Sequence, residues 1–294
     1  MSIISKNNTN HKVVKMNEIE KRKVVEHNDL ISSVAKMDKT PLKIFELAVS
    51  CIDTENPPKD NIIYLSKKEL FRFFKVSDND KHSRFKHAIE VMQKQAYFNI
   101  RQNKELGIEY ESIVPIPTVK WNSYNDDVFI RFNPDIMPYL IDLKNNFTQY
   151  ALSDVMELNS KYSIILYKWL SMNFNQYEHY SHKGGRRKEQ LEEYANPSIK
   201  ISELRQLTDT VNEYKKFPDF RKKTIDIPIE EINRHTHFMV TYEKIKKGRS
   251  IDSIQFHIAK KEQPIELNGE YKEREQDPAY LQGKVNKEVT QQAL

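Results

Sequence analysis

The sequence predicts an α+β protein made of two tandem winged-helix domains. The first observation is an order of elements: strand, capped helix, second helix and hairpin are expected in residues 62–132 and again in residues 199–258. The second observation is a cluster of cations on the last helix and on the hairpin tip of the second unit. In such an arrangement the helix enters the DNA major groove and the hairpin contacts phosphates.

Length and composition bound the remaining possibilities. With 294 residues the chain is long enough for about two domains. The sequence has no apolar run near 18 residues and begins with a polar stretch, which argues against membrane-spanning and secreted classes and predicts a cytoplasmic protein. The single cysteine, Cys51, lies in an apolar helical pattern and has no partner for an internal disulfide, so we expect a small core residue.

We expect four segments along the chain. A flexible N-terminal segment covers residues 1–26, the first winged helix 27–150, the second 151–261 and a disordered tail 262–294. The tail holds four basic and seven acidic residues, so the net charge of +5 leaves +8 for the rest of the chain. The predicted folded part is therefore basic, as a DNA-binding surface requires.

The first unit opens with a helix at Pro41 whose apolar residues continue to Ile52. A short strand follows at 62–65, and Ser66 with Glu69 forms a capping-box pattern that starts a helix at Lys67. A second helix is expected from residue 77 to the mid-90s, followed by three strands, which lie at residues 97–101, 109–117 and 127–132.

The second unit repeats this order. A helix is expected over residues 160–174, a hydrophilic flexible loop over 175–198, and a helix opened by Ser202. Its basic loop sequence HKGGRRKEQ is an added candidate for phosphate contact.

The basic helix begins near Pro218, which suits a first helical turn, and Pro228 is expected to interrupt or kink it. The hairpin that follows carries four cations within six residues at its tip. We expect the DNA-binding residues to be Arg221, Lys222, Lys223, Arg234, Lys244, Lys246, Lys247 and Arg249. Spacing alone leaves open a solvated helix and a lysine-rich turn.

Catalytic alternatives are weaker. His235 and His237 form the His-x-His pair that metal-dependent nicking initiators use, but a nucleophilic tyrosine on a downstream helix is not found in the required order. His179 and His182 stand without a cysteine or a second ligand pair nearby, and the GxxxxGK[ST] motif for nucleotide phosphates is absent from the sequence. We expect no catalytic site, no metal and no cofactor.

Four stretches resemble the iteron-binding plasmid replication initiators of the F-plasmid type. They are FPDFRKK (217–223), EIN (231–233), YEKIKKGRSIDSIQF (242–256) and the run at 137–170 that resembles the segment joining the two winged helices of that family.

This resemblance implies an initiator that binds direct repeats in double-stranded origin DNA, bends and opens the DNA and recruits the host initiator and replicative helicase. It also implies that the first winged helix serves dimerisation and auxiliary DNA contact, and that the second serves principal DNA recognition. As a homodimer the protein would repress its own gene. A winged-helix transcriptional regulator is the main alternative, and the nickase is a weaker one.

Overall fold

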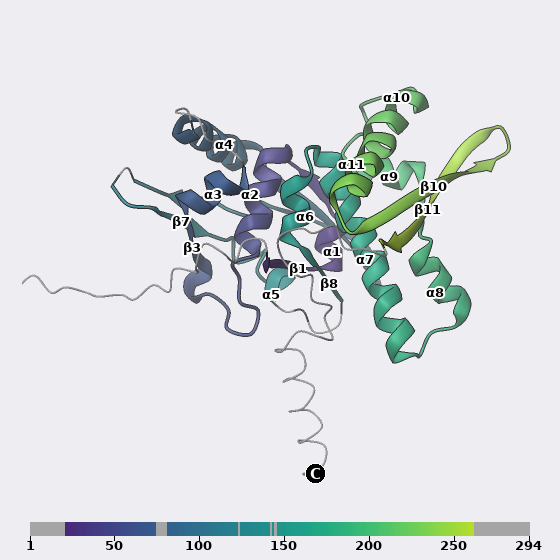
Figure 1. Ribbon diagram of the computed structural model, residues 1–294, viewed down its shortest axis with the longest axis horizontal. Coiled ribbons are helices and arrows are strands. Elements are labelled where there is room, and N and C mark those ends of the chain that lie inside the picture. The colour runs from purple at the N-terminus through teal and green to yellow at the C-terminus, as the bar shows by residue number, and fades with distance from the viewer. Residues whose placement is uncertain (1–20, 75–80, 123, 142, 144–145, 262–294) are drawn as a thin grey trace, which may run out of the picture.

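The computed structural model describes residues 21–74, 81–122, 124–141, 143 and 146–261. The expected disordered tail and residues 1–20 of the expected flexible segment lie outside these ranges. Within them the two winged-helix units of the predicted α+β class are confirmed. Figure 1 shows the first unit in purple to teal beside the second in green to yellow, with the long helix α7 between them.

The first unit follows the predicted order of strand, capped helix, second helix and strands. Its elements are β1 (Lys23–His27), α1 (Asn28–Ile31), β2 (Val34–Lys36), α2 (Lys39–Val49), the short 3₁₀ helix η2 (Lys59–Asn61), β3 (Ile62–Ser66), α3 (Lys67–Phe73), α4 (Lys81–Gln95), β4 (Tyr97–Lys104), β5 (Gly107–Ile113), β6 (Thr118–Lys120), β7 (Asp127–Arg131), α5 (Pro138–Ile141), β8 (Phe147–Ala151) and α6 (Leu152–Glu157).

The strands of the first unit divide between three small sheets, with orders β1-β8, β2-β4-β5 and β3-β7-β6. The hairpin β4–β5 therefore extends β2, while β3 pairs with β7. The capping box at the start of α3 is confirmed, because Ser66 accepts from the backbone N–H of Glu69 and the Glu69 carboxylate accepts from the N–H of Ser66.

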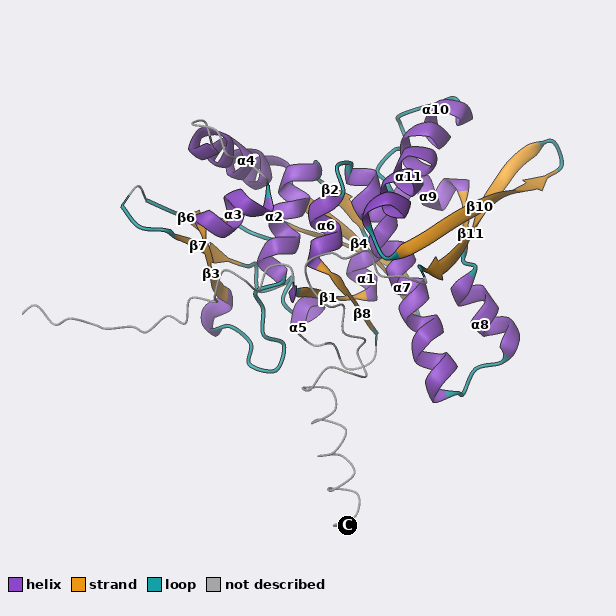
Figure 2. Cartoon of the chain, viewed as in Figure 1, coloured by secondary structure: helices purple, strands orange, loops and turns teal. Residues whose placement is uncertain are grey.

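The second unit repeats this architecture with one three-stranded sheet of order β10-β11-β9. Its elements are α7 (Lys161–Lys183), α8 (Lys188–Ala195), β9 (Ser198–Lys200), α9 (Ile201–Leu207), α10 (Phe217–Arg221), the π-helical turn η3 (Lys222–Asp226), α11 (Ile227–His235), β10 (Phe238–Lys247) and β11 (Ser250–Lys260). Helix α9 begins two residues earlier than predicted, since Lys200 and not Ser202 precedes its first turn. Figure 2 shows β10 and β11 as a long hairpin that projects from the body.

Two sequence-based expectations were wrong. The segment expected to be flexible up to residue 26 includes β1, which pairs antiparallel with β8, and Arg22 binds Glu69 at 2.6 Å. The expected loop at 175–198 is largely helical, because α7 continues to Lys183 and α8 begins at Lys188. Polar composition misled in the second case because neither α7 beyond Phe174 nor α8 contains a fully buried residue, so both can be helical with a mostly polar surface.

The helix that carries Pro228 is continuous. The backbone N–H of Ile227 bonds to the carbonyl of Lys222, five residues earlier, so the bonding pattern widens to a π turn directly before the proline. Pro228 has no N–H to donate and its ring would crowd the carbonyl four residues earlier. A π turn at this place relieves that crowding, so the expected interruption is replaced by a local widening.

A buried ion cluster joins the first unit to α7. The Lys168 ammonium lies 2.8 Å from Glu26 of β1 and 2.6 Å from Glu46 of α2, and the Tyr150 hydroxyl donates to Glu46 at 2.5 Å. Both carboxylates are fully buried and the Lys168 side chain is 5% exposed. Burial, then the neighbouring Glu46, raises the pKa of Glu26 from 4.5 to about 7, although Lys168 acts in the opposite direction.

This raised pKa predicts a pH-dependent stability. A carboxyl whose folded pKa is raised adds stability that is fully present below pH 4.5 and is lost as the pH rises through about 7. Glutamine mimics the protonated form, so the free energy of unfolding of Glu26→Gln should fall less between pH 5 and pH 7, about the window of these two pKa values, than that of the parent protein. Urea unfolding at several pH values measures this.

Glu90→Gln is the matched control, because Glu90 is exposed on α4 and its substitution should leave the pH dependence unchanged. Equal pH slopes for the parent protein and Glu26→Gln would mean that Glu26 stays ionised in the folded protein.

Candidate nucleic-acid interface

The continuous helix α10–η3–α11 presents its N-terminal part to solvent. Phe220, Ile225 and Ile232 are fully buried and hold one flank against the core of the second unit. Lys222 and Lys223 lie on the exposed flank of the π turn. Figure 1 shows α10 at the outer end of this helix, on the same side of the molecule as the hairpin β10–β11.

Arg221 differs from its two neighbours, because its Nε donates to Asp226 at 3.0 Å. The other oxygen of the Asp226 carboxylate accepts from the Tyr242 hydroxyl of β10 at 2.6 Å. Burial and the bond to Asp226 raise the pKa of Tyr242 to about 12, so the phenol stays a donor. Asp226 thereby ties the helix to the hairpin and fixes the angle between them.

The four predicted cations of the hairpin are brought together at its outer end. Lys244, Lys246, Lys247 and Arg249 are all exposed. The strands close on Gly248, whose φ of 63° is a conformation that glycine adopts without strain. By strand alternation Lys244 lies on the same face of β10 as Val240 and Tyr242, the face turned toward the helix.

Arg234 lies apart from the other seven predicted residues. It is on α11, twelve residues beyond Lys222, which corresponds to about 18 Å along a helix. Its side chain binds Glu230 at 3.0 Å in an exposed i,i+4 pair. The structure therefore groups seven of the predicted cations on the outer helix end and the hairpin, and leaves Arg234 at the inner helix end.

The two histidines of the His-x-His pair have separate surroundings. His235 is the last residue of α11, and His237 lies 2.8 Å from Asp154 of α6, which also accepts from the Tyr167 hydroxyl at 2.7 Å. Among the described residues, no three His, Cys, Asp or Glu side chains gather as a metal site would require. The described helices also include none long and apolar enough to cross a membrane.

Sequence reasoning missed Arg205 of α9, which organises the loop before α10. Its guanidinium donates to the carbonyls of Thr210 at 3.1 Å, Glu213 at 2.9 Å and Tyr214 at 2.9 Å, and it lies 4.1 Å from the Phe220 ring centre. The planar fork of arginine suits several acceptors at once. The loop that it holds leads to Lys215 and Lys216, two exposed cations that precede α10 and extend its basic end.

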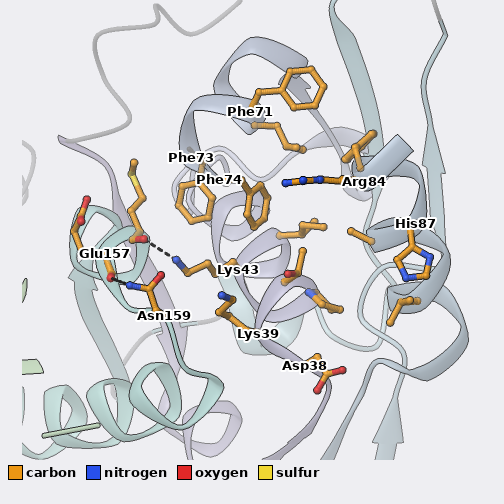
Figure 3. Close-up of a pocket in the computed structure, with 18 residues that line it drawn as sticks. Asp38, Lys39, Lys43, Phe71, Phe73, Phe74, Arg84, His87, Glu157 and Asn159 are labelled. Carbon is orange, nitrogen blue, oxygen red and sulfur yellow. Dashed lines mark hydrogen bonds between the residues drawn. The ribbon is translucent and has the colours of Figure 1, made fainter. Parts of the chain in front are cut away.

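A cleft of about 650 Å³ lies elsewhere, in the first unit, between α2, α3, α4 and the end of α6 (Figure 3). Phe71, Phe74 and Arg84 line it, and the Lys43 ammonium donates to the carbonyl of Met156 at 2.6 Å. This bond joins α2 to α6 at one side of the cleft.

The contacts of Arg205 predict a loss of stability on substitution. Arg205→Lys keeps the charge but cannot reach three carbonyls, so partly buried acceptors lose their donors. The free energy of unfolding should fall by about 1–3 kcal/mol. Arg234→Lys, an exposed paired arginine on the same unit, is the control and should change it by less than about 0.5 kcal/mol. Equal effects in urea unfolding would show that the guanidinium fork is dispensable.

Comparison with known proteins places this geometry in context. The family model described as initiator replication protein, WH1, matches residues 23–171, and that described as initiator Rep protein, WH2, matches residues 200–258. The chain is similar to the PI protein of Escherichia coli, with 21% identity over 268 residues that cover 83% of this chain and 85% of the relative.

Two further matches agree with these. A replication initiation protein of Escherichia coli is 24% identical over 143 residues, which cover 47% of this chain and 40% of the relative. A crystal structure of the Pi initiator protein in complex with iteron DNA has a TM-score of 0.64 at 19% identity and covers 83% of this chain and 99% of that one. The last match supports the fold.

Proposed function

The chain belongs to the initiator replication protein family, and from this premise we propose that it binds direct repeats in double-stranded DNA at a plasmid origin, bends and opens that DNA and recruits the host initiator and the replicative helicase. The observation that carries the DNA-binding proposal is the pair of cationic surfaces on the second unit, one on the helix end and one on the hairpin tip, held at a fixed angle by Asp226. The solved relative named above is a complex with iteron DNA, and we carry that ligand class over to this chain.

The two surfaces have different chemistry. Lys222 and Lys223 lie on the outer part of a rigid helix, the part that reaches base edges when such a helix enters the major groove. The hairpin cations are flexible lysines with one arginine, which supply charge but little fixed donor geometry, so they contact phosphates. Arg221 holds the helix to the hairpin through Asp226, and its guanidinium is proposed to contact DNA beside the two lysines.

For Arg234 we propose at most a contact with a DNA phosphate at the inner end of α11. It lies far from the other cations and is paired with Glu230. The proposed segments are residues 27–150 for dimerisation and auxiliary DNA contact and residues 151–261 for principal recognition. The dimerisation proposal is supported by β5, an edge strand of its sheet that carries the exposed residues Ile108 and Tyr110.

A transcriptional regulator would use the same helix and hairpin but would need only one palindrome beside its gene. Direct repeats next to the gene would favour the initiator over the regulator. We also propose that initiation involves no covalent step on DNA, since His237 is engaged with Asp154. The protein is thus expected to work as a DNA-binding protein in the cytoplasm.

The helix assignment predicts sequence-selective losses. Lys222→Ala or Lys223→Ala should weaken binding to the cognate repeat by about 1–3 kcal/mol for whichever lysine contacts a base, with a much smaller effect on random DNA. The combined alanine variant of the four hairpin cations should weaken both DNAs alike and reduce the salt slope by about 0.9 per lost phosphate contact. Lys59→Ala, an exposed lysine of the first unit, is the control. Fluorescence anisotropy measures all of these.

If both lysine variants weaken cognate and random DNA equally, the helix is a phosphate clamp. In that case the base contacts must be sought in the loop that carries Lys215 and Lys216.

The function as a whole predicts opening without cleavage. Supercoiled origin plasmid incubated with the protein and Mg²⁺ or Mn²⁺ should remain supercoiled, while single-strand-specific probes should detect unpaired bases near the repeats when host factors are added. His235→Ala combined with His237→Ala is the matched variant. Relaxed circles with protein joined to a DNA end, lost in that variant, would instead identify a nickase.

A further inference from the structure

A row of aromatic and cationic side chains crosses the outer face of the sheet β3-β7-β6 in the first unit. Tyr64 of β3 stands opposite Phe129 of β7, and Phe129 stands opposite Lys120 of β6, so the three side chains share one face in one row. The neighbouring residues on the opposite face, Ile63 and Ile130, are buried in the core. This row, with Arg131, is called the aromatic row below.

The contacts within the aromatic row are specific. The Tyr64 and Phe129 rings meet edge to face with centres 5.9 Å apart. The Lys120 ammonium lies 5.2 Å from the Phe129 ring centre, and the Arg131 guanidinium lies 5.5 Å from it. Tyr64 is 45% exposed, and both cations are exposed. The exposed Tyr64 ring and the half-buried Phe129 ring thus form an aromatic surface, and the two long cationic side chains lie over Phe129.

Duplex DNA does not use such a platform well. Paired bases stack on one another and offer only their edges in the grooves, whereas an aromatic ring on a flat sheet needs a base with a free face. Single-stranded nucleic acid offers both the free base face and the phosphate that Lys120 and Arg131 would neutralise. Tyr124, which is 85% exposed on the loop between β6 and β7, supplies a further ring beside the sheet.

We propose that the aromatic row is a binding site for single-stranded DNA, in which unpaired bases stack on Tyr64 and Phe129 and the phosphates meet Lys120 and Arg131. The site is separate from the helix and hairpin of the second unit, so one molecule holds duplex and single strand on different units (Figure 1). The proposal deepens the proposed function, because opening an origin produces the strand that this site would hold, but its binding test is independent of repeat recognition.

The test uses the full chain and a fluorescent oligothymidine of about 16 nucleotides, the upper end of common site sizes for single-strand-binding folds. Tyr64→Ala combined with Phe129→Ala should raise the dissociation constant at least tenfold, since the loss of stacking on a single base already raises it by about tenfold. Phe129→Leu, which keeps apolar volume but loses the ring, should weaken binding in the same direction. Tyr64→Phe should bind like the parent protein.

Two further measurements separate stacking from charge. Lys120→Ala and Arg131→Ala should each lower the magnitude of the salt slope by about 0.7, the value per phosphate contact on single strands. An oligonucleotide containing 2-aminopurine should be quenched by the parent protein and not by the double alanine variant. Val114→Ala, an apolar residue of the first unit that is 39% exposed outside both the aromatic row and strand β5, is the control and should bind like the parent.

Duplex repeat binding is measured in the same variants and should be unchanged, which shows that they are folded. Single-strand binding that is absent in the parent, or unchanged in the double alanine variant and in Phe129→Leu, overturns the proposal. If those variants instead change sedimentation of the protein alone and leave single-strand binding intact, the row is an interface between copies of the chain. Failure of the parent to bind the duplex repeat would overturn the proposed function. The single-strand site would then be judged from the single-strand measurements alone.

Discussion

The buried contact between Lys168 and the two carboxylates Glu26 and Glu46 is the constraint on which the arrangement of the two units depends. Lys168 belongs to α7, the first helix of the second unit, whereas its partners belong to a strand and a helix of the first unit. A buried charge without partners costs several kcal/mol, so α7 cannot leave the first unit without exposing or stranding these groups. The helix therefore serves as a core element of both units.

Further polar contacts extend this constraint toward α11. Glu231 of α11 accepts from the backbone N–H of Asn159 at 3.0 Å, directly before α7 begins, and His237 binds Asp154 of α6. A carboxylate at the start of a helix is favoured because it meets free N–H groups and the positive end of the helix dipole. Helix α11 is thus joined to α6 and α7, and through Lys168 of α7 to the first unit. The proposed recognition by the second unit with auxiliary DNA contact by the first would require such a fixed arrangement of the two units.

Local sequence signals predicted the fold well where a pattern is short-range. The capping box of Ser66 and Glu69, the alternation in β10 and β11 and the helix that starts near Pro218 were all readable from adjacent residues. Long-range partners were not readable. Strand β1 exists because β8 pairs with it, and α8 is positioned by contacts such as that of Asn196 with His257 of β11. The same limit applies to the candidate site, where the basic residues were predicted but Arg205, Asp226 and Tyr242 act through distant contacts.

The π turn explains why Arg221 is bonded to Asp226 while Lys222 and Lys223 remain exposed. A regular α-helix would be expected to bend at Pro228. The π turn absorbs the proline without a break and places Asp226 where it receives both Arg221 and Tyr242. Arg221 thereby holds the helix against the hairpin through Asp226, whereas Lys222 and Lys223 lie on the outer flank of the helix. Pro228, which the sequence predicted to break or kink the helix, therefore lies in a continuous helix that is joined to the hairpin through Asp226.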